Sequence, residues 1–479
     1  LSNADQFYYG GKKKTWTVTL EDGRILSGTN KDKVLCATVD GFVWKKLIDL
    51  KEDEFVCVKF GSECWGDGKI PIVHIEQCDK NNRQKIITIP NSPSYDLGLF
   101  FGMLTADGHI TKSNYVIGLT KNNDNVLNTF CCLVKKLFNI DMHKITDKRN
   151  GVMGVTVGCK SLIDWLSVIG FSKKNIPDFI LGGTRDMALG YLSGLYLDGW
   201  VVAKNNGNKQ INELALSQRY FSLLRDVQVL WDNLNVRTYF GDNIVDGRNY
   251  PTLRVKTFFI PLAASLLTFY EEHKIENAKI LITRTYDDTR RWPFINELLD
   301  NKIMARSKLY KIPYRSTVIK NALEKRYVFS DSKLEYDYLK VVNVKYNGLK
   351  DVFDLSVPET NRFIANGIVN HNTVNMPADS TVDQIVNVYK KAHYHGLKAI
   401  TIYVDGSKVL QPLKTEKKAA DSDVNRNESG NNIVGVTGGL GSLCDPRDVD
   451  LKGWAVQIGG EKFYVKFGWH PDVHDMLWE

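Results

Sequence analysis

Alternating apolar and polar residues dominate the beginning of the chain, whereas helical spacing dominates its middle. Residues 16–20 alternate, an Asp22-Gly23 turn follows and another strand begins, which is the pattern of a β-hairpin. From residue 94 to about 320, helical periodicity alternates with further hairpins. The pattern predicts a β-rich domain that is split by a mixed α/β insert. Short strands are then expected at 338–342, 351–355 and 363–369.

Residues 373–479 differ in character from both preceding parts. A stripe of apolar residues at helical spacing runs through 382–392, and a strand is expected at 399–403. Residues 414–432 are polar and read as a linker. A short β-like piece at 462–467 lies near the end of the chain.

Composition narrows the class of protein. A chain of 479 residues is too long for one ordinary core, so two to four domains are expected. The net charge of +8 permits nucleic-acid binding without demonstrating it. No apolar run reaches the roughly 18 residues that span a bilayer, and no signal peptide opens the chain, so no membrane partner is expected. Eight scattered cysteines, none in a CxxC pair, favour reduced thiols and a cytoplasmic location.

Two segments in the insert resemble each other. In 97–108, Gly98, Gly102 and Ala106 recur every four residues, so they share one helix face and let another helix approach closely. The second segment, 190–199, repeats the pattern, and both segments end in Asp-Gly. Packing two such helices side by side would bring their terminal aspartates together.

These aspartates are Asp107 and Asp198, and a pair of carboxylates suits divalent-metal hydrolysis of a phosphodiester. The alternative for a single copy is ordinary helix packing with a C-terminal cap. Two copies, each followed by hairpin patterns, favour the catalytic interpretation.

The two segments look like the paired motifs of LAGLIDADG homing endonucleases, and residues 155–166 followed by 174–177 are similar to the segment that precedes the second motif in that family. The resemblance implies a two-repeat fold that cleaves double-stranded DNA with Mg²⁺ bound by Asp107 and Asp198. The second motif departs from the first, because Gly102 to Asp107 is five residues and Gly194 to Asp198 is four. Either the second helix ends early and still presents Asp198, or the second metal site is damaged.

Basic residues on the expected hairpins are candidates for contacts with phosphates or base edges. Arg254 and Lys256 are expected to share one strand face, opposite Leu253 and Val255. The remaining candidates lie in or beside turns: Lys204, Lys209, Lys148 and Arg149. A merely solvated basic face is an equally weighted alternative for any one of them.

The stretch 363–373 closely resembles the C-terminal splicing blocks of inteins. It ends in His371-Asn372-Thr373 after an apolar Asn-Gly hairpin. In this chemistry, the side-chain amide of Asn372 attacks its own backbone carbonyl, and the adjacent His371 donates a proton to the leaving amine. Thr373 offers the hydroxyl nucleophile that accepts the upstream acyl group.

Other intein positions match in part. Thr29 matches the Thr of a Thr-x-x-His motif, but Asp32 stands in place of the His, and Asn361 stands where a His often precedes the late Phe. Asp354 matches an acidic position of the family. The family's N-terminal Cys or Ser nucleophile is not found, so a missing upstream intein and host segment is expected as a partner.

The residues after the junction resemble adenosylcobalamin-dependent (class II) ribonucleotide reductases, in their late barrel segment and their C-terminal accessory region. The resemblance implies that such a reductase is the host, and that its cobalamin and active sites lie outside this chain.

Together these patterns predict a multidomain protein: an all-β, horseshoe-like splicing domain (Hint fold), interrupted by an α+β two-repeat LAGLIDADG endonuclease and followed by an α/β reductase C-terminal fragment. The endonuclease is expected to be monomeric. One alternative function is a reductase fragment with a degenerate, inert insert, and another is a DNA-binding module without cleavage. The expected boundaries are 1–93 and 325–372 for the splicing halves, 94–324 for the endonuclease, 373–413 for the barrel segment, 414–432 for the linker and 433–479 for the accessory region.

Overall fold

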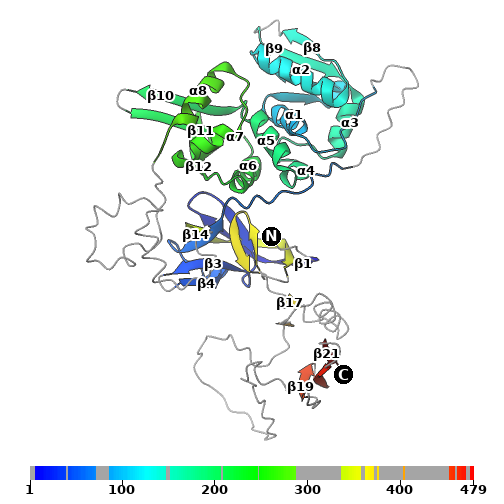
Figure 1. The fold of residues 1–479 in the computed structure, drawn as a ribbon, viewed down its shortest axis with the longest axis vertical. Helices are drawn as coiled ribbons and strands as arrows, with labels where there is room; N and C mark the ends of the chain where they lie inside the picture. The colour runs from blue at the N-terminus through cyan, green and yellow to red at the C-terminus, as the bar shows by residue number, and fades with distance from the viewer. Residues whose placement is uncertain are drawn as a thin grey trace. The chain divides into compact units, whose positions relative to one another are not determined.

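The computed structural model describes most of residues 6–371 and a few strands beyond them (Figure 1). The described ranges are 6–38, 41–71, 86–146, 151–206, 209–245, 247–286, 336–357, 362–371, 375–376, 403–404, 452–458, 461–470 and 475–478. The chain divides into two compact units, Leu1–Thr373 and Val374–Glu479.

The ends of the first unit form a β domain. Its described elements are β1 (Gln6–Leu20), β2 (Ile25–Gly28), β3 (Lys33–Thr38), β4 (Gly41–Lys46), the 3-10 helix η1 (Leu47–Asp49), β5 (Phe55–Lys59), β14 (Tyr336–Ser356), β15 (Arg362–Ala365) and β16 (Ile368–His371). The strands form one eight-stranded sheet in the order β15-β16-β3-β5-β14-β1-β2, with β4 paired to β3. Strands from before and after the insert therefore interleave in the same sheet.

The predicted Asp-Gly hairpin is present between β1 and β2. Val18 lies opposite Leu26, and both side chains are buried in the core of the sheet. Gly23 in the turn has a φ of +87°, a backbone conformation that favours glycine.

The prediction of separate strands at 338–342 and 351–355 is wrong, because β14 is one continuous strand of 21 residues. Its first part pairs with β5 and its later part pairs with β1. Three register shifts along the β1–β14 ladder increase its local twist, which lets one strand pass from one neighbour to the next.

The insert contains an α-β-β-α-β-β order twice. The first repeat comprises α1 (Tyr95–Ala106), β6 (Gly108–Thr111), η2 (Lys112–Asn114), β7 (Val116–Thr120), α2 (Asp124–Phe138), β8 (His143–Thr146) and β9 (Met153–Gly158). The second comprises α5 (Arg185–Leu195), β10 (Gly199–Asn206), β11 (Lys209–Ser217), α6 (Phe221–Asn233), β12 (Thr238–Val245) and β13 (Arg248–Val255). Other described elements are α3 (Lys160–Val168), α4 (Asp178–Leu181), η3 (Thr257–Phe259), α7 (Ile260–Leu266) and α8 (Glu272–Thr283). Each repeat has its own four-stranded sheet, β6-β7-β9-β8 and β10-β11-β13-β12.

Helices α1 and α5 pack against each other through the predicted glycine stripe. A Cβ atom on Gly98 would lie 2.0 Å from the carbonyl oxygen of Met187, and one on Gly102 would lie 2.1 Å from that of Tyr191. On the facing helix, a Cβ on Gly194 would lie 2.6 Å from backbone atoms of α1. Only glycine allows the two backbones to approach so closely, so the stripe sets the relative position of the helix ends.

The second unit is described only as strands. These are β17 (Asn375–Met376), β18 (Tyr403–Val404), β19 (Lys452–Ile458), β20 (Glu461–His470) and β21 (Asp475–Trp478). The strand predicted at 462–467 is confirmed as part of β20. The predicted helix at 382–392, most of the strand at 399–403 and the linker at 414–432 lie outside the described residues.

No helix in the described part of the chain is long and apolar enough to cross a membrane. Six cysteines among the described residues are free thiols. The horseshoe-like outline of the splicing domain stays a prediction.

Candidate functional site

Asp107 and Asp198 lie at the paired C-terminal ends of α1 and α5. Asp107 is the residue that caps α1, and its backbone N–H donates to the carbonyl oxygen of Met103 at 3.2 Å. Asp198 follows three residues after the end of α5. Nζ of Lys121 contacts both Asp107, at 2.7 Å, and the carbonyl oxygen of Leu197 directly before Asp198, at 3.1 Å, so the structure brings together the two helix ends that the sequence pairs.

The shorter spacing of the second motif is compensated by a tighter turn. After α5, the N–H groups of Leu197, Asp198 and Gly199 donate to carbonyl oxygens three residues earlier, at 3.1–3.2 Å. Such 3-10 geometry turns about 120° and rises about 2.0 Å per residue, against roughly 100° and 1.5 Å in an α-helix. The tight turn therefore offsets much of the difference between four and five α-helical steps. Of the two alternatives for the second motif, the geometry favours a helix that ends early and still presents Asp198.

Each carboxylate has a side-chain partner from the strand region that follows its own helix. Nζ of Lys121 lies 2.7 Å from Oδ2 of Asp107, and Nε2 of Gln218 donates to Oδ2 of Asp198 at 2.9 Å. Lys121 comes directly after β7, and Gln218 comes directly after β11. The two repeats thus place a cationic and a neutral donor at equivalent positions.

Three further charged side chains surround the two aspartates. Nζ of Lys274 donates to the carbonyl oxygens of Tyr196 at 3.0 Å and Leu197 at 2.6 Å, directly before Asp198. Glu271 forms ion pairs with Lys274 and with Lys121. The third is Lys173, whose Nζ donates to the carbonyl oxygen of Ala106 at 3.1 Å.

The charges of this cluster shift one another. Burial raises the pKa of Asp198, and the charge of Asp107 adds to that effect. Burial lowers the pKa of Lys173 despite the opposing influence of both aspartates. For Lys121, burial acts downward, but the hydrogen bond and charge of Asp107 outweigh it, so its pKa is raised. The site therefore concentrates negative charge between partly desolvated cations.

The oxygen atoms of this cluster suit a hard divalent cation that keeps some of its coordination positions for water. Carboxylate and carbonyl oxygens suit Mg²⁺, which usually retains water and takes one or two protein carboxylates. Burial and, after it, the charge of Asp107 raise the pKa of Asp198, and a cation between the two carboxylates would stabilise their ionised forms. Within the described ranges, no group of three or more His, Cys, Asp or Glu residues is arranged around a point.

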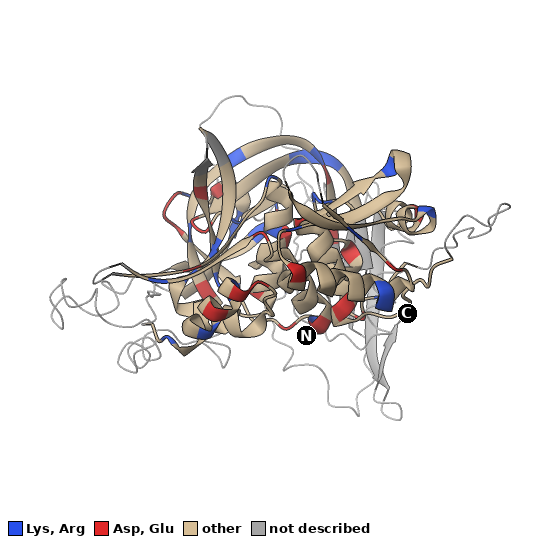
Figure 2. Ribbon diagram, turned by 90° about the horizontal axis from the view of Figure 1, so that it is seen from above, with Lys and Arg blue, Asp and Glu red and all other residues tan. Residues whose placement is uncertain are grey.

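Some of the predicted DNA-contact residues lie on the second four-stranded sheet of the insert. Figure 2 shows Lys and Arg along the curved strands of the molecule. Arg254 lies on β13 and forms an ion pair with Glu213 on the neighbouring β11. Lys204 is exposed on β10.

The remaining DNA candidates are less well placed. The prediction that Lys256 shares a strand with Arg254 is wrong, since β13 ends at Val255 and Lys256 precedes the 3-10 turn η3. Lys209 begins β11, and its side chain is not among those described. Lys148 and Arg149 lie outside the described residues.

The predicted Asn-Gly hairpin joins β15 to β16 and leads to the splice junction. Asn366 and Gly367 have φ values of +49° and +76°, which is the requirement of a tight type I′ hairpin turn. The four residues of β16 end at His371, whose ring lies edge-on to Trp44 with 4.9 Å between ring centroids. Asn372 and Thr373 lie outside the described residues.

Thr29 and Asp32 form a small turn beside β3. The backbone N–H of Thr29 donates to Oδ2 of Asp32 at 2.6 Å, and Thr29 is 9% exposed. Burial raises the pKa of Asp32. The next residue, Lys33, pairs with His371 across the β16–β3 ladder, so the turn lies at the strand end next to the junction. Asp354 lies on β14, opposite Tyr8 of β1.

Sequence reasoning missed several of these residues. A polar residue directly after the second strand of each hairpin was the available signal for Lys121 and Gln218. Lys173 lies directly before residues 174–177, which are similar to part of the segment preceding the second motif in LAGLIDADG endonucleases. Trp44 and Lys274 had no sequence signal, since each meets the site only through tertiary packing.

The comparisons with known proteins fit this arrangement. A family model described as the intein splicing domain matches residues 3–372. Because the match takes in well over half of the 479 residues, the chain belongs to the intein splicing domain family. The intein predicted from residues 363–373 is thereby confirmed.

Most of the similar curated proteins are ribonucleotide reductases, and one is the replicative DNA helicase DnaB of Nostoc sp. (strain PCC 7120 / SAG 25.82 / UTEX 2576), 38% identical over 56 residues, which are 12% of this chain and 6% of that protein. The α subunit of ribonucleoside-diphosphate reductase NrdEB of Bacillus subtilis (strain 168) is 23% identical over 328 residues, which are 63% of this chain and 27% of that protein. A vitamin B12-dependent ribonucleotide reductase of Streptantibioticus cattleyicolor is 50% identical over 46 residues, 10% of this chain and 8% of that protein. The chain thus spans 27% or less of the length of these two relatives.

Among solved structures, the homing endonuclease I-DmoI in complex with DNA and Ca has a TM-score of 0.29 and 17% identity, and the match covers 40% of this chain and 98% of that chain. Full-length DUF199/WhiA has a TM-score of 0.26 and 13% identity, covering 50% of this chain and 63% of that chain.

Proposed function

We propose that this intein cleaves the peptide bond after Asn372 by cyclisation of the asparagine. The side-chain amide nitrogen forms a bond to the backbone carbonyl carbon of Asn372, and the bond to the nitrogen of Thr373 breaks. His371 donates the proton that the leaving amine needs, and a succinimide remains at the new C-terminus. In full splicing, the hydroxyl of Thr373 would first accept the upstream acyl group.

The hairpin that ends at His371 is the observation that carries this proposal. A tight Asn-Gly turn and the ring of Trp44 hold the strand end, so His371 lies at a fixed place in the sheet. The splicing domain would comprise residues 1–93 and 325–372, with Thr29, Asp32 and Asp354 as further members of its site. The family's Thr-x-x-His motif has a His where this chain has Asp32, and this difference bears on the first acyl shift of splicing.

We further propose that the insert, residues 94–324, is a LAGLIDADG endonuclease that cleaves double-stranded DNA as a monomer. Asp107 and Asp198 would hold Mg²⁺, which supplies a Lewis acid that activates water and stabilises the leaving oxygen. The meeting of these two carboxylates at the ends of packed helices carries the proposal. A damaged second metal site is disfavoured by the compensating turn before Asp198.

The other side chains of the cluster have roles that follow from their positions. Lys121 and Lys173 place cationic groups beside the two aspartates, where they would offset charge on a cleaved phosphate. Lys274 holds the turn that presents Asp198. Arg254 and Lys204 on the second sheet would contact DNA, with Lys256, Lys209, Lys148 and Arg149 as further candidates.

The segment after the junction is proposed to belong to an adenosylcobalamin-dependent ribonucleotide reductase of the cytoplasm. Support comes from the similarity to vitamin B12-dependent reductases. Residues 373–413 would be its late barrel segment, 414–432 a linker and 433–479 an accessory region. The cobalamin site would lie in an upstream host segment, and no membrane partner is proposed.

Incubation of the purified full chain tests the splicing proposal. Cleavage after Asn372 releases residues 373–479, a fragment of about 12 kDa in proportion to the 54.4 kDa of the whole chain. The Asn372→Ala variant should release none. Equal behaviour of the parent and this variant on SDS gels would overturn the proposal.

DNA cleavage is tested with Mg²⁺ and DNA that carries the uninterrupted host gene. We expect Asp107→Asn to abolish cleavage while DNA binding is retained. The matched control is Asp96→Asn, at the opposite end of the same helix, where the carboxylate is paired with Lys136. Equal cleavage by the parent and Asp107→Asn would contradict the assignment.

A further inference from the structure

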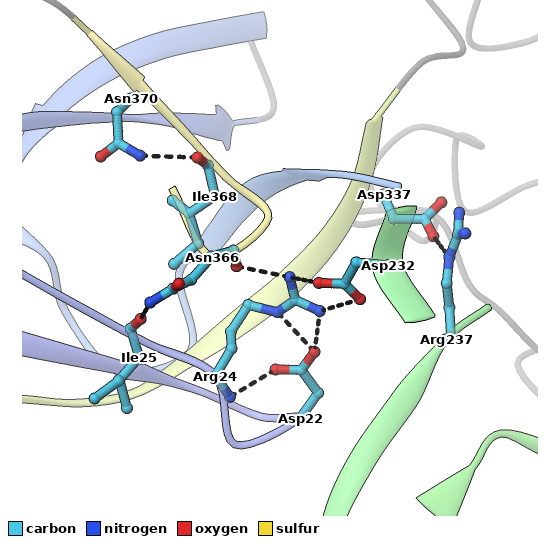
Figure 3. A network of polar contacts seen from close by, with 9 residues as sticks. All are labelled: Asp22, Arg24, Ile25, Asp232, Arg237, Asp337, Asn366, Ile368 and Asn370. Atoms are coloured by element: carbon cyan, nitrogen blue, oxygen red, sulfur yellow. Dashed lines mark hydrogen bonds and ion pairs between the residues drawn. The ribbon is translucent and has the colours of Figure 1, made fainter. Parts of the chain in front are cut away.

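Arg24 is buried at a point where three distant segments meet (Figure 3). It lies just before β2 in the turn from β1, within the splicing domain. Its guanidinium faces Asp232 near the end of α6, which belongs to the insert. The same guanidinium reaches Asn366, in the turn of the hairpin that leads to the splice junction.

The guanidinium bridges all three segments by direct hydrogen bonds. Nε donates to Oδ2 of Asp22 at 2.7 Å, and Nη2 donates to Oδ1 of Asp232 at 3.3 Å. Nη1 donates both to Oδ2 of Asp232 at 3.0 Å and to the carbonyl oxygen of Asn366 at 2.9 Å. One charged side chain thus ties a carboxylate of the insert to the splice hairpin.

The hairpin turn lies directly against the guanidinium of Arg24 and has no room for a side chain at position 367. A Cβ atom on Gly367 would lie 1.9 Å from Nη1 of Arg24 and 3.0 Å from Oδ2 of Asp232. The carbonyl oxygen of Gly367 also accepts the N–H of Lys59 at 2.8 Å. A shift of Arg24 would therefore move the start of β16, whose four residues end at His371.

The insert is docked at this place by its backbone as well. The carbonyl oxygen of Asp232 accepts the N–H of Gly61 at 2.7 Å, and the N–H of Phe240 donates to the carbonyl oxygen of Asp22 at 3.0 Å. Arg24 and Asp232 are 1% and 5% exposed. A buried charge that loses its partner is strongly unfavourable, so the bridge specifies one position for each segment.

We infer that Asp232 and Arg24 are positioning residues for cleavage after Asn372, so that the splicing reaction depends on the docked insert. The inference rests on the proposed splicing function. Neither residue touches the reacting bond; they act through the turn at Asn366 and Gly367 and the short strand that leads to His371. The insert is then a structural part of the splicing site in this chain.

Two conservative variants of the full chain test the inference. Arg24→Lys keeps the charge but cannot bridge Asp22, Asp232 and Asn366 together, and Asp232→Asn keeps the shape but removes the charge. We expect each to slow release of the C-terminal fragment by about tenfold or more, since small misplacements of reacting groups have effects of this size. The matched control is Arg237→Lys, which weakens another buried bridge between insert and sheet, from Arg237 Nε to Asp337.

A second measurement separates positioning from general stability. Amide hydrogen exchange of Ile368–His371 should be about tenfold faster in Arg24→Lys and Asp232→Asn, and unchanged in Arg237→Lys. Equal slowing of cleavage in all three variants at equal melting temperatures would overturn the inference, as would parental cleavage rates in the first two. If the parent itself releases no fragment, the splicing proposal fails. The exchange measurement does not depend on cleavage, so unchanged exchange of β16 in Arg24→Lys and Asp232→Asn would refute the positioning role by itself.

Discussion

Nζ of Lys121 lies 2.7 Å from Oδ2 of Asp107, whereas the corresponding place beside Asp198 holds the uncharged amide of Gln218 at 2.9 Å. The two halves of the cluster are thus similar in geometry and unequal in charge. Lys121 also donates to the carbonyl oxygen of Leu197 at 3.1 Å, so it reaches across from one repeat to the other.

Replacement of this cation should affect DNA cleavage more than DNA binding. Lys121→Met leaves Asp107 and Glu271 without the cation that they share and removes a proton donor, so we expect cleavage to fall by roughly 10²-fold. Single-turnover cleavage with saturating protein measures the effect, and gel shifts measure binding. Lys135→Met is the control, because Lys135 pairs with Asp141 at the exposed end of α2. Parental cleavage by Lys121→Met would show that this lysine has no part in the reaction.

The glycines of the helix pair should not tolerate even one methyl group. In Gly194→Ala, the new Cβ would lie 2.6 Å from the carbonyl oxygen of Leu99 and from the backbone nitrogen of Met103, which cannot move aside as side chains do. We expect a loss of about 1–3 kcal/mol in the free energy of unfolding, together with weaker DNA cleavage. Urea unfolding measures the first effect. Gly158→Ala is the control, since nothing lies within 4 Å of its Cβ position, and equal stability of the two variants would contradict the packing argument.

The sequence predicted those elements whose signals are local. The Asp22-Gly23 turn, the glycine stripe of α1 and the Asn366-Gly367 hairpin all depend on residues within one or two turns of chain. Asp198 shows where prediction from local signals fails. Its four-residue spacing from Gly194 suggests a side chain that points away from the site, and only the 3-10 hydrogen bonds after α5 show otherwise. Its position depends on helix tightening, which residue identity alone does not specify.

The long-range contacts had no such signal. Arg24 meets Asp232, which is 208 residues away, and Asn366, which is 342 residues away. Nothing near Arg24 in sequence distinguishes it from a turn residue exposed to water. Similarly, β14 is one strand where two were predicted, and its pairing with β5 and then with β1 joins segments that are far apart in the sequence.

Trp44 should be important for cleavage at the splice junction. Its ring meets that of His371 edge-on, so Trp44→Leu removes a wall that holds the imidazole and changes the polarity around it. We expect release of the C-terminal fragment to slow by about tenfold, with partial rescue in Trp44→Phe. Trp16→Leu is the matched control, because Trp16 makes a similar edge contact with Tyr346 on the β1–β14 ladder. Equal effects of the two substitutions would indicate a general loss of stability instead.

Asp32 should make the stability of the splicing domain depend on pH. Burial raises the pKa of Asp32 above that of the unfolded chain, against the opposing hydrogen bonds from Thr29 and the charge of Lys13. The folded state therefore binds the proton more tightly than the unfolded state. The resulting stabilisation is complete below the unfolded pKa of about 3.9 and is lost as the pH rises through the folded pKa.

Asp32→Asn should remove this dependence. The amide oxygen can still accept the N–H of Thr29, as Oδ2 of Asp32 does at 2.6 Å, but it carries no charge into the buried turn. We expect the variant to gain free energy of unfolding relative to the parent as the pH is raised from about 4 to 8. Urea unfolding followed by tryptophan fluorescence at several pH values measures this difference. A difference that stays constant or shrinks with rising pH would mean that the hydrogen bonds from Thr29, and not burial, determine the ionisation of Asp32.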